Sequence, residues 1–224
     1  MARLLLLPLL LLLACGGSEP PQASEDANAT PGKLAPPLVD GDCQEYAGLG
    51  VESINLTEGV DLFLFQDSHY VWLCYTYPPN SFGTMDLVLE TDTLPASLNL
   101  HVSAQIGEWP ADQKDEAPQD PESDKWWNAR GWMANPVWIN GMDTSGDKPR
   151  YRFKNAPARE VQLSKERFGR GDWRFSLNIR AIRGPDGMFQ EVNFPQDGGR
   201  YTLKTAAGSE VPAPAHSSGP DRPE

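Results

Sequence analysis

Hydrophobic and polar residues alternate along most of the chain with the period of two that is typical of β-strands. The two clearest runs, at 60–66 and 70–77, are separated only by Asp-Ser-His, which predicts a hairpin. Further runs follow at 85–90, 98–106, 132–139, 150–153, 159–163, 173–182 and 200–204. Turn-forming Pro, Gly and Asn residues separate them. The pattern predicts an all-β fold over residues 41–205, an antiparallel, jelly-roll-like β-sandwich.

One short helix is predicted near 164–168. Ser164 is a suitable N-cap residue and Gly169 a suitable residue to end the helix. The chain shows no internal repeat. Without its two polar ends it has the length of a single domain.

Residues 1–14 read MARLLLLPLLLLLA, with an arginine followed by a short apolar run. Crossing a bilayer requires about 20 apolar residues, so this run instead indicates a secretory signal peptide. Its end, Leu-Leu-Ala-Cys-Gly, resembles the lipobox of bacterial lipoproteins. The resemblance implies cleavage before Cys15, lipid attachment to that cysteine, and a stable anchor without a transmembrane helix. A signal peptide that is cleaved without lipidation is the alternative.

The predicted location is the bacterial cell envelope, and Gly16 in place of aspartate favours the outer membrane. The segment from Cys15 to residue 40 is rich in Pro, Ala, Ser and acidic residues and predicts a disordered tether. Residues 206–224 have the same composition and predict a disordered tail.

Acidic residues outnumber basic ones, 31 to 19, which gives a net charge of −12. Such a chain repels nucleic acids and anionic lipid headgroups, so nucleic acid is excluded as a partner and the membrane is expected to be reached through the anchor. Seven of the carboxylates lie within 108–124, which predicts a solvated loop.

Apart from Cys15 the chain has two cysteines, Cys43 and Cys74. An isolated pair in an oxidising compartment usually forms a disulfide. The pair is therefore predicted to be bonded, with two buried free thiols as the alternative.

Several segments resemble carbohydrate-binding module family 9 and the related DOMON-like domains. Asp40-Gly41-Asp42 with Tyr46, followed by VDLFLFQDSHYVWLCYTY at 60–77, is similar to the opening of that family. Glu160-Val161-Gln162-Leu163 with the segment 165–169 is similar to its later strand and short helix. The chain differs from the family at Tyr46, where tryptophan is usual, and at Leu163-Ser164, where Ile-Pro is common. The resemblance implies a β-sandwich of this kind.

Four of the seven tryptophans lie in KWWNARGWMANPVWING at 125–141. Sugar C–H faces stack on aromatic rings, and hydroxyl groups need amides or charged groups nearby. The predicted saccharide site therefore consists of Trp126, Trp132, Asn128, Arg130 and Asn135. The alternative is that these rings fill the core. We expect two of the four in the core and one or two at the surface.

Further predictions concern the burial of individual tryptophans. Trp72 and Trp173 lie in the middle of predicted strands and are assigned to the core. Trp109 lies at the start of the acidic segment, and the sequence favours neither burial nor exposure of its side chain. Trp126 and Trp127 are expected to differ in burial.

Motifs for catalysis are missing from the sequence. Neither a nucleophile motif nor a zinc spacing occurs, and carboxylates in a mobile loop are poorly held for glycoside hydrolysis. No enzyme activity, cofactor or metal is therefore expected, and 143–147 is predicted to be a plain turn, not a calcium loop. Haem binding, known in some DOMON-like domains, would draw on Met85, Met133, His69 and His101.

The predicted function is a tethered, non-catalytic lipoprotein whose sandwich binds a neutral saccharide. The alternative is a periplasmic scaffold that contacts another envelope protein.

Overall fold

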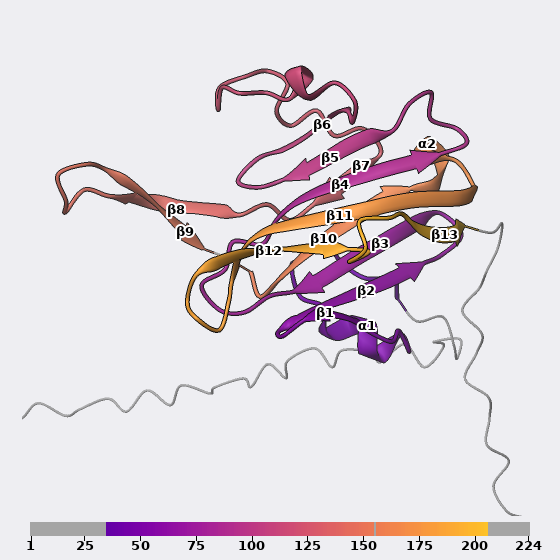
Figure 1. The fold of residues 1–224 in the computed structure, drawn as a ribbon, viewed down its shortest axis with the longest axis horizontal. Helices are drawn as coiled ribbons and strands as arrows, with labels where there is room; N and C mark the ends of the chain where they lie inside the picture. Colours follow the sequence, from indigo (N-terminus) through magenta and orange to yellow (C-terminus); the bar gives the residue numbers. More distant parts are fainter. Residues whose placement is uncertain (1–34, 155, 206–224) are drawn as a thin grey trace, which may run out of the picture. The chain divides into compact units, whose positions relative to one another are not determined.

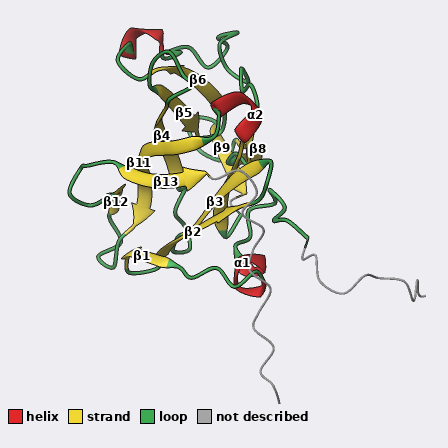
Figure 2. Ribbon diagram, turned by 90° about the vertical axis from the view of Figure 1, so that its right-hand side faces the viewer, coloured by secondary structure: helices red, strands yellow, loops and turns green. Residues whose placement is uncertain are grey.

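The structure is a computed structural model that describes residues 35–154 and 156–205. Two antiparallel sheets form the domain (Figures 1 and 2). The first sheet contains, in spatial order, β1 (Ile54–Thr57), β2 (Val60–Gln66), β3 (Tyr70–Thr76), β10 (Ala158–Ser164) and β7 (Trp132–Ala134). The second contains β12 (Phe189–Phe194), β11 (Gly171–Arg183), β4 (Thr84–Thr91), β5 (Leu98–Val102) and β6 (Ile106–Pro110), with β13 (Tyr201–Thr205) also paired to β11. The predicted all-β sandwich is confirmed.

The core lies between the two sheets because each strand turns every second side chain inward. In β4, Met85, Leu87 and Leu89 are fully buried, while the residues between them are partly exposed. Leu62 and Leu73 from the first sheet join the same cluster. Trp72 and Trp173 are both 1 % exposed, as expected for structural residues.

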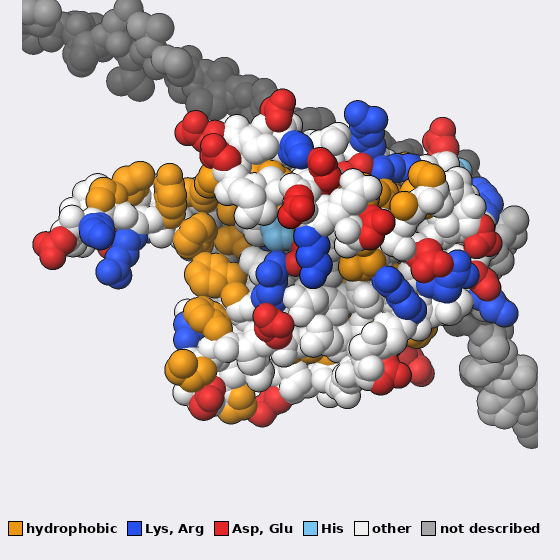
Figure 3. All heavy atoms as spheres, turned by 45° about the horizontal axis from the view of Figure 1, so that its top comes forward, with side chains coloured by type: hydrophobic (Ala, Val, Ile, Leu, Met, Phe, Trp, Pro, Cys, Tyr) orange, Lys and Arg blue, Asp and Glu red, His pale blue; other side chains and the backbone are white. Residues whose placement is uncertain are grey.

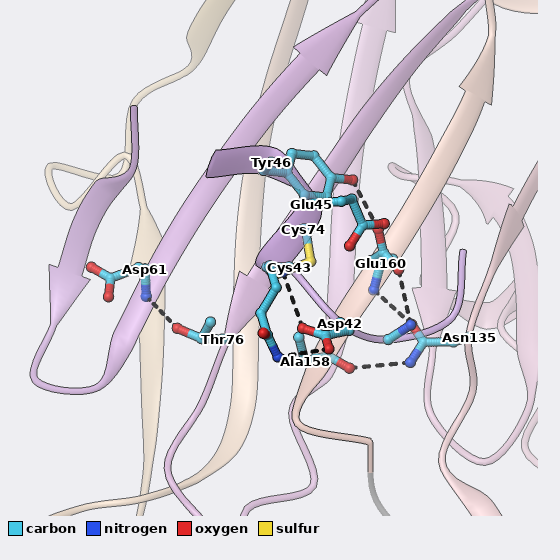
Figure 4. The surroundings of a disulfide bond; sticks show 12 residues. Asp42, Cys43, Glu45, Tyr46, Asp61, Cys74, Thr76, Asn135, Ala158 and Glu160 are labelled. Carbon is cyan, nitrogen blue, oxygen red and sulfur yellow. Dashed lines mark hydrogen bonds between the residues drawn. A yellow bond between two sulfur atoms is a disulfide. The ribbon is translucent and has the colours of Figure 1, made fainter. Parts of the chain in front are cut away.

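A second, smaller core covers the outer face of the first sheet. The five-residue helix α1 (Gln44–Gly48) lies there, and its Tyr46 is fully buried together with Trp72 and Phe65. Cys43 and Cys74 form a disulfide that joins this segment to β3, so the predicted bond is confirmed (Figure 4). The first sheet is therefore covered on both faces.

The helix α2 (Lys165–Phe168) confirms the helix predicted near 164–168. The Ser164 hydroxyl accepts a hydrogen bond from the backbone N–H of Glu166, and Gly169 follows the helix. The helix α1 and the 3-10 turn η1 (Lys114–Glu116) were not predicted. The strands β1, β6 and β12 were not predicted either.

The predicted strand at 132–139 is wrong in its extent. Proline has no N–H for a sheet, and Pro136 separates β7 from β8 (Trp138–Asp143). β7 pairs with β10, whereas β8 pairs with β9 (Arg150–Lys154) in a two-stranded sheet of their own. Trp132 and Trp138 therefore belong to different parts of the molecule.

Ahead of the predicted domain start at residue 41, the backbone N–H groups of Leu38 and Asp40 donate hydrogen bonds to the side chains of Glu45 and Glu160. The predicted signal peptide, Cys15, most of the tether and the tail at 206–224 lie outside the described residues. Within the described part of the chain, no helix is long and apolar enough to cross a membrane.

Candidate functional site

The five predicted site residues do not meet in one exposed cleft. Trp132 is 6 % exposed, and its indole N–H donates to the Glu108 carboxylate at 2.6 Å. Asn135 is also buried, where its side chain accepts from the Glu160 N–H and donates to the Ala158 carbonyl. These two side chains hold the strands together and are not available to a ligand.

The other three predicted residues lie nearer the surface. Asn128 and Arg130 are exposed, and Trp126 is half-buried. Trp127, at 58 % exposure, is the more open of the adjacent pair and has φ = +64°, a conformation that is uncommon for a side chain of this size. Its backbone N–H donates to the Ile106 carbonyl, which fixes this segment against β6.

Strand register brings Trp126 to the outer face of the second sheet. Asp86 on β4 is paired with His101 on β5, and His101 is paired with Gly107 on β6. The Trp126 ring lies directly against Gly107, where a Cβ atom would be 3.1 Å from its Cε3. In the next row Asn99 is paired with Trp109.

Three aromatic side chains therefore form a cluster on this face. The His101 ring centroid is 5.7 Å from that of Trp109 and 5.6 Å from that of Trp126. The two indoles meet edge to face at 6.4 Å, and the Trp126 N–H donates to the Asp120 carbonyl. We call His101, Trp109 and Trp126 the aromatic cluster.

Polar side chains adjoin the aromatic cluster around Asp86. The first Asp86 oxygen accepts from Asn99 at 2.9 Å and lies 2.8 Å from His101 Nδ1, and the second accepts from Arg180. Burial acts to raise the pKa of Asp86, but the hydrogen bonds from His101 and Asn99 outweigh it and hold the pKa below its usual value. The carboxylate is thus ionised and can only accept, so His101 carries a hydrogen on the Nδ1 atom that faces it and can form a further hydrogen bond at Nε2.

A second polar centre lies under α1, on the outer face of the first sheet (Figure 4). One Glu160 oxygen accepts from the backbone N–H groups of Asp40 and Gly41, and the other accepts from the Tyr46 hydroxyl, all at 2.9 Å. Burial raises the pKa of Glu160 to about 7, although these hydrogen bonds act to lower it. Burial likewise raises the pKa of Tyr46, which remains a donor.

Carboxylate oxygens of Asp40, Glu45 and Glu160 lie within 4.8 Å of one another, an arrangement that could hold a metal ion. Each of the three carboxylates already accepts a hydrogen bond from the chain itself. The arrangement is explained by the attachment of residues 38–46 to β10. We therefore treat it as part of the fold.

The four residues considered for haem ligation are spread over the domain. Met85 is fully buried in the core, whereas its neighbour in the sheet, His101, lies on the opposite face against Asp86. Met133 is 51 % exposed on β7, and His69 lies in the β2–β3 turn with Ser68.

The predicted turn at 143–147 forms a local hydrogen-bonded loop. Asp143 accepts from both the backbone N–H and the hydroxyl of Ser145. Those bonds lower the pKa of Asp143.

No protein-family model, curated protein or solved structure matches this chain. The resemblance to carbohydrate-binding module family 9 therefore remains an expectation from the sequence motifs.

Proposed function

We propose that the domain binds a neutral saccharide on the outer face of the second sheet, at the aromatic cluster. The observation that supports this most directly is the meeting of Trp109, Trp126 and His101 beside Asp86 and Asn99. Ring faces of this kind can stack on the C–H faces of a sugar. The Nε2 atom of His101 and the partly exposed carboxylate of Asp86 can bind the hydroxyl groups, while Asn99, which is buried, holds that carboxylate in place.

The rigid support of the aromatic cluster favours a binding role. Recognition is sharpest when the contacting side chains are held in place by strands and by further hydrogen bonds. Here β4, β5 and β6 hold the polar groups, and Asp120 fixes the Trp126 ring. Of the residues that the sequence predicted for the saccharide site, Trp126 is part of the proposed site, whereas Trp132 and Asn135 are not, because they are buried.

The proposal includes a non-catalytic role and attachment to the bacterial outer membrane by a lipid on Cys15. Both come from the sequence: the absence of a catalytic motif and the lipobox-like segment before Cys15. A secreted domain joined to its lipid by a Pro-rich spacer suits the capture of a polymer close to the cell surface.

The test is calorimetric titration of the chain from Gly16 onward with a panel of neutral oligosaccharides. We expect Trp109→Ala and Trp126→Ala each to weaken binding at least tenfold, with near-UV circular dichroism showing that the fold is kept. Trp138→Ala is the matched control, because this indole is 60 % exposed and lies on the separate β8–β9 sheet. The proposal would be contradicted if all three variants bound with the same affinity as the unaltered chain, or if the unaltered chain bound no member of the panel.

A further inference from the structure

The β8–β9 sheet presents an unusual number of large hydrophobic side chains to solvent. Ile139 is 52 % exposed, Met142 48 %, Tyr151 60 % and Phe153 41 %. A two-stranded sheet by itself is only marginally stable in water. A contiguous exposed apolar surface usually marks a place where something binds.

The register puts these four residues on one face of the ribbon. Ile139 is paired with Phe153 and Met142 with Tyr151, and an irregularity between the two pairs keeps the side chains on the same side. Arg150, Arg152 and Lys154 alternate with them along β9 and so point to the opposite face. Trp138 is paired with Lys154 and Asp143 with Arg150, so this second face also carries an exposed indole and one acidic side chain. The ribbon therefore has one apolar face and one face on which basic side chains predominate.

The apolar face continues onto the body of the domain. The Phe82 ring meets Phe153 at 5.3 Å and Phe189 at 5.8 Å, so the β11–β12 turn joins the same surface. That turn also carries Met188, which is 68 % exposed. Figure 3 shows hydrophobic side chains gathered along the ribbon at the left and over the part of the domain beside it, with basic side chains on the ribbon's other side.

The ribbon differs from the rest of the chain in the sign of its net charge. Residues 138–154 contain four basic and two acidic residues, a net charge of +2. Subtracting this from the −12 of the whole chain leaves −14 for the remainder. The ribbon is thus a positive region on an otherwise acidic protein, a distribution that the net charge alone does not reveal.

We propose that the β8–β9 ribbon binds the surface of a bilayer that contains anionic phospholipids. Its four hydrophobic side chains enter the boundary between headgroups and acyl chains, and its lysine and arginine side chains reach the phosphates. Aromatic rings with a polar edge, such as Tyr151, are favoured at that depth. This inference depends neither on saccharide binding nor on lipidation of Cys15.

A second copy of the chain is a poorer occupant for this face. A fully exposed side chain of this size presents about 200 Å², and the four ribbon residues together with Met188 and Phe189 are each 41 to 68 % exposed, so the continuous face offers about 630 Å². Two copies joined face to face would bury about 1,300 Å², at the lower limit for a stable protein interface, and they would bring two positively charged ribbons together, which repel each other. A bilayer needs no complementary shape, and it supplies negative charge to every cation on the ribbon.

The experiment measures co-sedimentation of the chain from Gly16 onward with vesicles. This chain keeps all the residues that the structure describes, 35–154 and 156–205. We expect binding to vesicles of phosphatidylethanolamine and phosphatidylglycerol, weaker binding at high salt, and none to phosphatidylcholine vesicles. The pair Ile139→Ser and Tyr151→Ser should weaken binding at least tenfold, whereas Leu38→Ser, at a residue 68 % exposed, should leave it unchanged.

A second pair of variants tests the basic face. Arg152→Glu with Lys154→Glu should abolish the preference for phosphatidylglycerol, while Arg170→Glu, at an exposed residue outside the ribbon, should not. Failure of the unaltered chain to sediment with the anionic vesicles would overturn the proposal. So would equal binding by all the variants, or a light-scattering mass showing a dimer that the Ile139→Ser and Tyr151→Ser pair dissociates.

Discussion

The buried carboxyl group of Glu160 makes the stability of the domain depend on pH in a direction opposite to that of most carboxylates. Burial raises the pKa of Glu160 from 4.5 to about 7 in the folded protein. In the unfolded chain the group has its ordinary value. Between these two values the folded protein binds a proton that the unfolded chain has lost, so the free energy of unfolding falls as the pH rises.

The size of the effect follows from the difference between the two pKa values. Each unit corresponds to about 1.36 kcal/mol, so the loss between pH 4.5 and 7 is about 3 kcal/mol. For a domain of this length that lowers the melting temperature by about 10 °C. Asp86, whose pKa is lowered, loses its contribution as the pH falls through its folded value. Histidine side chains also titrate between pH 5 and 8, so the contribution of Glu160 is isolated by comparison with a variant that cannot ionise at this position.

The matched variant is Glu160→Gln. The amide oxygen takes the place of Oε2 and still accepts from the N–H groups of Asp40 and Gly41. The amide NH₂ takes the place of Oε1 and can donate to the Tyr46 oxygen. The variant cannot ionise. We expect it to match the unaltered protein near pH 5 and to be more stable by about 3 kcal/mol at pH 8.

Urea denaturation followed by tryptophan fluorescence, repeated from pH 5 to pH 8.5, measures both quantities. Glu58→Gln, at an exposed residue in the β1–β2 turn, is the control for removing one negative charge. If the unaltered protein gains stability over this range, or if Glu160→Gln keeps the same slope, the account of Glu160 is refuted.

Two further predictions concern contacts that join separate parts of the fold. Replacing Cys43 and Cys74 by alanine should lower the free energy of unfolding by about 4 kcal/mol on the chain-entropy model for a separation of 31 residues; calorimetry of the two forms checks this, and an unchanged melting temperature would contradict it. Arg167→Met should cost about 3–5 kcal/mol, because it leaves the Glu108 carboxylate, 8 % exposed, without its cation. Adding Glu108→Gln should recover part of that loss in urea denaturation, and no recovery would argue against an unpaired charge as the cause.

Strand positions could be predicted from the sequence because burial follows the pattern of each strand alone. In β4, Met85 and Leu87 face the core whatever strand lies beside them, and the alternation makes this visible. The helix α1 gives no such signal. Its five residues are held by the disulfide and by the contact of Tyr46 with Glu160, which is 114 residues away in the chain.

The candidate site could be predicted only in part, because its members come together through strand pairing. Trp126 was identified from its aromatic neighbours in sequence, but the rings it meets belong to His101 and Trp109. Asn135 has the composition of a ligand-binding amide, yet its partners are backbone groups of residues 158 and 160. The alternation of Asn99 and His101 in LNLHV is a signal that could have indicated polar side chains on the outer face of β5, but no prediction was drawn from it.

The two outer faces of the sandwich use their large side chains differently, and this difference decides where a ligand can bind. On the first sheet Tyr46 and Trp72 are buried under α1, so their rings stabilise the fold and are closed to a sugar. On the second sheet Trp109 and Trp126 remain only half-buried, beside an ionised carboxylate that fixes His101. A half-buried indole gives up part of its possible burial energy. That cost is understandable if the open ring faces serve to bind a ligand.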